Sequence, residues 1–234
     1  MRRYFDRQDK QKKFTFLMKD ELSSKRPKNR RFSWAVNETK YLDLEKVKKL
    51  RQKLKEAKNK ALKENKIVPV RNWFMVELGL FTGLRVEEMV NLKESDFHLK
   101  GGHSSLTVKR GKGDKPRTVY LPETFKNECL FYLSWKEKLL EKIDFLFTNS
   151  KGRQLTKRAL QKAFKRCLKL ASLEDHYSIR CLRHTYGSFL YKSSIHNLRM
   201  VQEQLGHSSI RTTEIYASLM NEDVKKAVER LYQG

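Results

Sequence analysis

The sequence is poor in cysteine, proline and glycine, and it has no long apolar run. Its three cysteines are odd in number and far apart, which excludes a Cys-x-x-Cys metal site and is typical of reduced thiols in a cytoplasmic protein. No stretch approaches the roughly 18 apolar residues of a membrane-spanning helix. The apolar run Phe14–Met18 is shorter than the core of a signal peptide, which has about 7–15 residues. We therefore expect a cytoplasmic protein.

Acidic residues are scarce relative to basic ones. The 234 residues include 52 Lys and Arg against 27 Asp and Glu, and the formal net charge at pH 7 is +25. Solubility of a small domain requires a net charge of only about 2–8. Charge of one sign repels itself unless a polyanion neutralises it, so we expect nucleic acid as the first partner to consider and an anionic membrane surface as the second. Hydrophobic residues make up 38% of the chain, which is enough to build a core.

The apolar pattern predicts a mainly α fold with a small antiparallel β-sheet, an α+β protein. Glycines and β-branched residues between His98 and Leu121 predict the sheet, with a basic turn between two strands. Pro69 is expected to stop one helix, and Gly83 to end the next. Helices are predicted over residues 42–65, 73–81, 86–92, 123–142, 156–170, 180–191, 197–205, 212–220 and 222–232.

Two regions follow from this pattern. Residues 1–39 are interpreted as a basic arm that is partly disordered or holds one short helix, and residues 40–234 as one folded domain with a C-terminal helix. That last helix has an apolar stripe along one face.

The predicted helix over residues 156–170 has one apolar and one strongly basic face. Its six cations cannot form ion pairs with one another, which favours a contact with nucleic acid over a merely solvated face. These cations are Lys157, Arg158, Lys162, Lys165, Arg166 and Lys169.

Several residues have side chains suited to a phosphodiester. Guanidinium groups match the shape and charge of a phosphoryl-transfer transition state and remain cationic. Each candidate is weak by itself, because arginines are common in a basic protein and a lone histidine or tyrosine is usually structural. The segment from Val201 to Leu219 is also compatible with a plain helix-turn-helix. The candidates are Arg85, Lys112, Arg183, His207 and Tyr216.

The order of four short motifs removes most of this ambiguity. They are Thr82–Glu88, Gly111–Lys115, Leu182–Thr185 and Leu205–Tyr216. In this order they resemble the signature boxes of the tyrosine recombinase (phage integrase) family, from about Lys40 to Tyr232. The resemblance implies the catalytic domain of a site-specific recombinase or integrase, an enzyme of DNA integration and mobile genetic elements.

The resemblance also implies a role for each candidate. Arg85 and Arg183 look like the pair that clamps the scissile phosphate. Lys112 looks like the hairpin lysine that protonates the leaving 5′-oxygen, and His207 like the histidine that binds a non-bridging oxygen. Tyr216 looks like the nucleophile that forms a 3′-phosphotyrosine, which stores the energy of the broken bond for rejoining. With these cations in place, no metal or other cofactor is expected.

Further positions follow from the same motifs. Glu88 and His184 are similar to residues that support the two arginines, and Lys115 and Arg211 are expected to contact DNA. The family usually has a histidine where Arg180 stands, and His176 lies at the wrong spacing to replace it. Arginine can bind phosphate but cannot exchange a proton near neutral pH. We expect an active enzyme with Arg180 in the catalytic set.

The expected partners are double-stranded DNA and further copies of the chain, as a tetramer on two DNA sites at the nucleoid. Family members typically carry another helical DNA-binding domain ahead of the catalytic one. Three interpretations are open: a compact recombinase with the catalytic domain alone, a truncated gene product, or a protein whose basic arm takes part of that role. In the family the C-terminal helix often packs into a neighbouring subunit, and packing onto its own domain is the alternative. Two alternatives remain open: a DNA-binding protein that descends from a recombinase, and a type IB topoisomerase-like enzyme.

Overall fold

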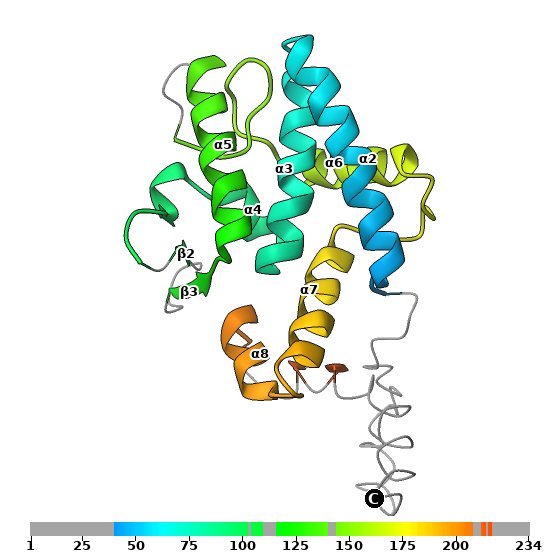
Figure 1. Ribbon diagram of the computed structural model, residues 1–234, viewed down its shortest axis with the longest axis vertical. Helices are drawn as coiled ribbons and strands as arrows, with labels where there is room; N and C mark the ends of the chain where they lie inside the picture. Colours follow the sequence, from blue (N-terminus) through cyan, green and yellow to red (C-terminus); the bar gives the residue numbers. More distant parts are fainter. Residues whose placement is uncertain are drawn as a thin grey trace, which may run out of the picture. The chain divides into compact units, whose positions relative to one another are not determined.

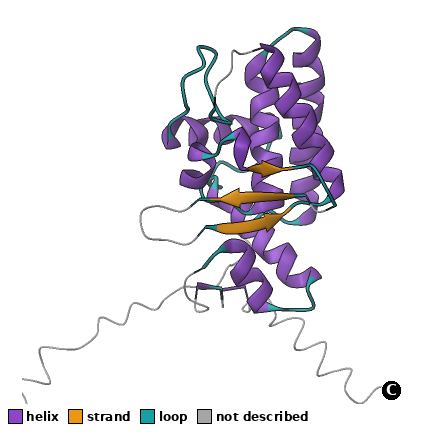
Figure 2. Cartoon of the chain, turned by 90° about the vertical axis from the view of Figure 1, so that its left-hand side faces the viewer, coloured by secondary structure: helices purple, strands orange, loops and turns teal. Residues whose placement is uncertain are grey.

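A computed structural model describes residues 40–102, 104–109, 116–139, 144–207, 212–213 and 215–216. Helices dominate this part of the chain, and three short strands form one antiparallel sheet in the order β1-β2-β3 (Figures 1 and 2). The predicted fold class is therefore confirmed. Within the described residues, no helix is both long and apolar enough to cross a membrane.

Two long helices, α2 (Leu44–Lys63) and α3 (Ile67–Thr82), lie side by side (Figure 1). Helix α2 begins where the Asp43 side chain accepts a hydrogen bond from the Lys46 amide at 2.8 Å. Helix α3 is buried along most of its length and starts six residues before the predicted position. As expected, the first helix does not continue past Pro69, since α2 ends at Lys63. Pro69 lies in the first turn of α3, where its missing N–H removes no helical hydrogen bond.

The sheet consists of β1 (Phe97–His98), β2 (Ser105–Val108) and β3 (Arg117–Tyr120). In the pair β2–β3, Leu106 is opposite Val119 and Val108 is opposite Arg117. The 3₁₀ helix η1 (Glu94–Asp96) precedes β1. Leu106, Val108 and Val119 are buried, so one face of the sheet packs on the core.

In the part of the chain that the structure describes, five other helices begin within one residue of the predicted positions and end within three residues of them. They are α4 (Val86–Asn91), α5 (Glu123–Leu139), α6 (Lys157–Leu170), α7 (Arg180–Ser193) and α8 (Leu198–Leu205). Thr156 and Asn197 act as N-caps, with side chains that accept from the amides of Ala159 and Met200.

The buried apolar residues form two clusters. The larger joins α2, α3, α5, α6 and the sheet, and includes Phe74 stacked on Tyr132 with ring centroids 4.0 Å apart. The smaller contains Tyr191, Val201, Leu205 and Tyr216, so it joins α7 and α8 to the segment that follows α8. This second cluster holds the candidate nucleophile beside the helix that carries Arg183.

Several expectations lie outside the described residues and stay predictions. They concern the basic arm over residues 1–39, the boundary at residue 40, the C-terminal helix and its packing, and the side chains of Lys112, Lys115 and Arg211.

Candidate active site

Gly83 ends α3 and sets the direction of the chain toward Arg85. Its φ of 59° lies in the left-handed region that glycine adopts without strain. A Cβ there would lie 2.5 Å from Cδ1 of Tyr186 and 2.7 Å from Cδ2 of Leu205. The position therefore needs glycine both for its conformation and for the close approach of α7 and α8.

Arg85 is the N-cap residue of α4 and is held by Glu88. The Arg85 amide donates to Oε2 of Glu88 at 2.7 Å, and its Nη1 donates to Oε1 at 3.0 Å. The Arg85 side chain is still 43% exposed. Glu88 thus fixes the base of Arg85 while its guanidinium group remains accessible from solvent.

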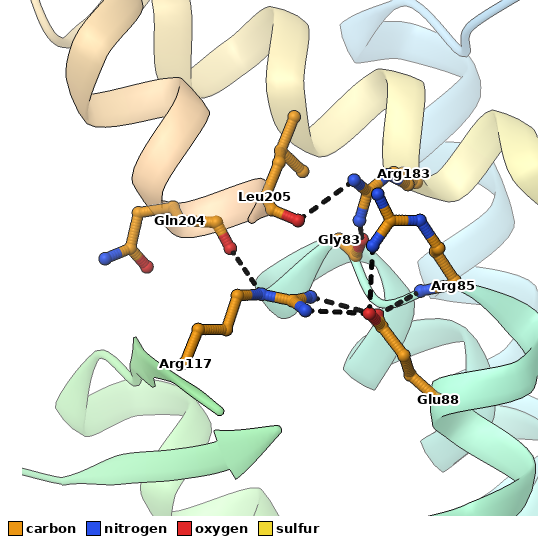
Figure 3. A network of polar contacts seen from close by, with 7 residues as sticks. All are labelled: Gly83, Arg85, Glu88, Arg117, Arg183, Gln204 and Leu205. Carbon is orange, nitrogen blue, oxygen red and sulfur yellow. Dashed lines mark hydrogen bonds and ion pairs between the residues drawn. The ribbon is translucent and has the colours of Figure 1, made fainter. Parts of the chain in front are cut away.

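Arg117, the first residue of β3, binds the same carboxylate. Its Nη1 and Nη2 donate to the two oxygens of Glu88 at 2.7 and 2.9 Å, and its Nε donates to the Gln204 carbonyl at 3.1 Å (Figure 3). Burial alone would raise the pKa of Glu88, but the hydrogen bonds and charge of Arg117, together with those of Arg85, lower it to about 2. Glu88 is therefore ionised at neutral pH.

Sequence reasoning missed Arg117. The available signal was its position at the start of a predicted strand, which is weak because the chain has 52 Lys and Arg residues.

Arg183 lies in α7 and is buried, with 8% of its surface exposed. Its Nη1 donates to the Gly83 carbonyl at 2.7 Å and its Nη2 to the Leu205 carbonyl at 3.0 Å (Figure 3). These carbonyls lie at the C-terminal ends of α3 and α8, where helices have unpaired acceptors and partial negative charge. Burial, followed by the charge of Arg85, lowers the pKa of Arg183 to about 10, so the group remains a cation.

His207 follows α8 and is anchored on both sides. Its Nδ1 is 2.9 Å from Oγ1 of Thr213, and its backbone amide donates to the Gln202 carbonyl at 3.0 Å. Burial lowers its pKa to about 3, and the charges of Arg183 and Arg85 contribute. The ring is therefore neutral in the DNA-free protein.

Tyr216 is almost fully buried, at 1% exposure, and packs against α7. A Cβ at Gly187 would lie 2.5 Å from its Cζ and 2.6 Å from its Oη. Its ring centroid is 6.4 Å from that of His184. Burial raises the pKa of Tyr216 to about 12, against the opposing charges of Arg183 and Arg85. The phenol is protonated and lies near the arginine cluster.

These residues form a site with excess positive charge. The guanidinium groups of Arg85 and Arg117 both bind the carboxylate of Glu88, and that of Arg183 lies nearby on the carbonyls of Gly83 and Leu205 (Figure 3). Such an arrangement favours an anion with several oxygens.

A family model described as "Phage integrase family" matches residues 40–223 of this chain. The chain belongs to the phage integrase family. It is 37% identical over 163 residues to tyrosine recombinase XerH of Helicobacter pylori, which covers 68% of this chain and 44% of the relative. It is 36% identical over 177 residues to tyrosine recombinase XerD of Oceanobacillus iheyensis, and the aligned part covers 74% of this chain and 57% of the relative. The chain thus spans about half the length of these curated relatives.

Several solved structures have a fold similar to that of this chain. A crystal structure of XerH bound to palindromic difH substrate, a post-cleavage complex, matches with a TM-score of 0.67 and 31% identity, over 84% of this chain and 54% of that one. A crystal structure of XerA recombinase matches with a TM-score of 0.67 and 26% identity, over 82% of this chain and 65% of that one. The catalytic domain of bacteriophage HP1 integrase shares the fold, with a TM-score of 0.52 over 82% of this chain and 96% of that one.

Arg180, the residue that departs from the phage integrase pattern, begins α7 and is exposed. It lines a cavity of about 150 Å³ together with Lys40, His176 and His184. Arg180 precedes Arg183 by about one helical turn in α7. Its place in the catalytic set stays a prediction.

His184 follows Arg183 in α7 and lines the same cavity as Arg180. Its Nδ1 is buried and has no hydrogen-bond partner among the described residues. Burial lowers its pKa to about 4, and the charges of Arg183, Lys40 and Arg180 contribute. His184 is therefore a neutral ring in contact with Tyr216.

The basic face of α6 is partly paired with acids from other elements. Lys157 contacts Oε1 of Glu87 at 2.5 Å, and Lys165 contacts Oδ1 of Asp175 at 3.2 Å. The four other cations of this face are exposed: Arg158, Lys162, Arg166 and Lys169. In the described part of the chain, no group of three or more His, Cys, Asp or Glu side chains could hold a metal ion.

Proposed function

We propose that this chain is a site-specific DNA recombinase that breaks and rejoins DNA through a 3′-phosphotyrosine intermediate. The observation that carries the proposal is the convergence of Arg85 and Arg183 beside the buried Tyr216. The names of the relatives support it, since XerH and XerD are tyrosine recombinases.

The arginines supply what a phosphodiester needs from this site. A phosphoryl-transfer transition state spreads negative charge over its non-bridging oxygens, and fixed cations stabilise that charge. Arg183 is held by two helix-terminal carbonyls and keeps N–H groups for a phosphate, since a guanidinium has five. Arg85 is held through Glu88 and offers the second guanidinium.

In the proposed reaction, the Oη of Tyr216 attacks phosphorus, and the bond from phosphorus to the 5′-oxygen breaks. The phenol releases its proton to solvent water as the new bond forms, and the charges of Arg183 and Arg85 favour the phenolate. Lys112 is proposed to protonate the leaving 5′-oxygen. His207, oriented by Thr213 through Nδ1, is proposed to contact a non-bridging oxygen with its other ring nitrogen.

The remaining parts of the proposal concern assembly and location. Lys115, Arg211 and the exposed cations of α6 are proposed to contact the DNA backbone. The active form is proposed to be a homotetramer on two DNA sites, in the cytoplasm at the nucleoid.

Covalent capture tests the proposal even though the target sequence is unidentified. The full chain is incubated with a library of nicked duplexes of randomised sequence, denatured in SDS, and the DNA that stays attached is sequenced. We expect one sequence family to be enriched, and Tyr216→Phe to capture none. Binding in a gel shift without any adduct would favour a DNA-binding descendant, whereas relaxation of supercoiled plasmid without sequence preference would favour a topoisomerase-like enzyme. An adduct of equal yield with Tyr216→Phe would refute the assigned nucleophile.

A further inference from the structure

Arg117 occupies the centre of the polar network, although it belongs to the sheet and not to the predicted site. Its side chain and that of Glu88 are each only 8% exposed. Through three hydrogen bonds it joins β3 to the first turn of α4 and to the end of α8 (Figure 3). Because these hydrogen bonds come from one buried, planar guanidinium group, they fix the positions of β3, α4 and α8 relative to one another.

The carboxylate of Glu88 is shared between two arginines. Its Oε1 accepts from Arg117 at 2.7 Å and from the Arg85 guanidinium at 3.0 Å. Its Oε2 accepts from Arg117 at 2.9 Å and from the Arg85 amide at 2.7 Å. The negative charge of Glu88 is thus balanced mainly by the buried Arg117. Without Arg117, the same charge would be balanced by Arg85 alone, whose guanidinium would then be held as a counter-ion.

The contact with α8 ties Arg117 to the second arginine. Arg117 binds the carbonyl of Gln204, and Arg183 binds the carbonyl of the next residue, Leu205. His207 follows two residues later. Arg117 therefore helps to hold the end of α8 against which Arg183 is fixed.

We infer that Arg117 is a positioning residue: it neutralises Glu88 so that the Arg85 guanidinium stays available to the DNA phosphate. Arg117 begins β3, five residues after Lys112 in the sequence. This inference rests on the proposed function.

The test compares single-turnover adduct formation at saturating DNA for Arg117→Gln, Arg117→Lys and the double variant Glu88→Gln/Arg117→Gln. The DNA is the nicked duplex enriched by covalent capture. We expect Arg117→Gln to slow the reaction by about tenfold to a hundredfold. Arg117→Lys keeps the positive charge, so its rate of adduct formation is expected to fall less than that of Arg117→Gln. The double variant should recover most of the rate, because a neutral amide no longer captures Arg85.

Arg51→Gln is the matched control. Arg51 makes a similar two-oxygen contact to a buried carboxylate, that of Glu77, at 2.9 and 3.0 Å. Its loss should lower stability without slowing adduct formation by the folded protein. A wild-type rate in Arg117→Gln at saturating DNA would overturn the inference, as would a double variant no faster than the single one.

A second measurement separates this inference from the proposed function. If the wild-type chain forms no adduct with any duplex, the proposed function fails, and affinity for a fluorescent duplex of random sequence then decides the role of Arg117. We expect Arg85→Ala to weaken binding in the wild-type background and to have little further effect in Arg117→Gln. An equal loss in both backgrounds would show that Arg117 does not control Arg85.

Discussion

The phenol ring of Tyr216 lies directly against Gly187 in α7. The space is so narrow that a Cβ at position 187 would come within 2.5 Å of Cζ and 2.6 Å of Oη. Gly187 is four residues after Arg183, so the two positions are neighbours on one helix face. The location of the proposed nucleophile relative to the arginine thus depends on the absence of a side chain at this point.

The first prediction concerns this contact. Gly187→Ala should displace Tyr216 and slow adduct formation by at least about tenfold, since small misplacements of a reacting group are costly. Gly102→Ala is the control, because a Cβ there meets nothing within 4 Å. Time courses of adduct formation on the nicked duplex provide the measurement. Equal rates for both variants would mean that Tyr216 leaves this contact before it reacts.

The second prediction contrasts two arginines one turn apart. In Arg183→Lys, a single ammonium group cannot reach both the Gly83 and Leu205 carbonyls. Both the free energy of unfolding and the rate of adduct formation should therefore fall. Arg180→Ala removes an exposed side chain and should slow adduct formation while leaving the urea midpoint unchanged. Arg180→His tests whether a group that can exchange a proton raises the rate. A lowered urea midpoint for Arg180→Ala would contradict the exposed position.

The third prediction concerns Gly83. Alanine there would have to adopt a φ of 59° and would meet Tyr186 and Leu205. A non-glycine residue in this region costs on the order of 1–3 kcal/mol, before the steric contacts are counted. The free energy of unfolding in urea should therefore fall by at least that amount, with Gly102→Ala again as the control. An unchanged midpoint would show that α7 and α8 shift to accommodate the methyl group.

The fourth prediction is a loss of stability as the pH falls. The pKa values of His184 and His207, about 4 and about 3, lie below the ordinary 6.5, so below pH 6.5 the unfolded chain binds more protons than the folded one. The free energy of unfolding should decrease from pH 6.5 downward, by on the order of 1–2 kcal/mol per histidine at pH 5. Urea titrations between pH 7.5 and pH 5 measure it. The dependence should be weaker in His184→Asn, and an unchanged slope would show that His184 is protonated in the folded state.

The fifth prediction concerns the exposed cations of α6. Lys162→Glu and Lys169→Glu should each weaken DNA binding, and each lost phosphate contact should reduce the slope of log K against log salt by about 0.9. Lys60→Glu on α2 changes the net charge equally and is the control. Titrations over a range of salt concentrations measure both quantities. Similar slopes for all three variants would assign the effect to net charge alone.

Local patterns were sufficient to predict most of the helices. Thr156, Asn197 and Gly83 mark helix ends through bonds and conformations that involve only nearby residues, and each lies where the pattern placed it. The predicted start of α3 at residue 73 is wrong, because Pro69 lies within the first turn of this helix and not ahead of it. Whether a proline precedes a helix or lies in its first turn depends on where the helix packs, which periodicity alone does not reveal.

The motifs also brought Arg85, Glu88 and Arg183 to attention, and the structure places them together. Arg117 could not be found in the same way, since its role arises from a carboxylate 29 residues earlier in the chain. The pairing of Lys157 with Glu87 was likewise invisible, because the two residues are 70 positions apart.

By itself, the sequence determined the fold class, the family and the identity of the candidate residues, because helix periodicity, turn chemistry and motif order are all encoded over short distances. Only the tertiary structure decided how these residues share their contacts. It buried Tyr216 against Gly187, gave Arg183 two helix-terminal carbonyls, and divided Glu88 between Arg85 and Arg117. The physical reason is that hydrogen bonds and charges act over a few ångströms in space, so their partners are set by packing and not by separation along the chain.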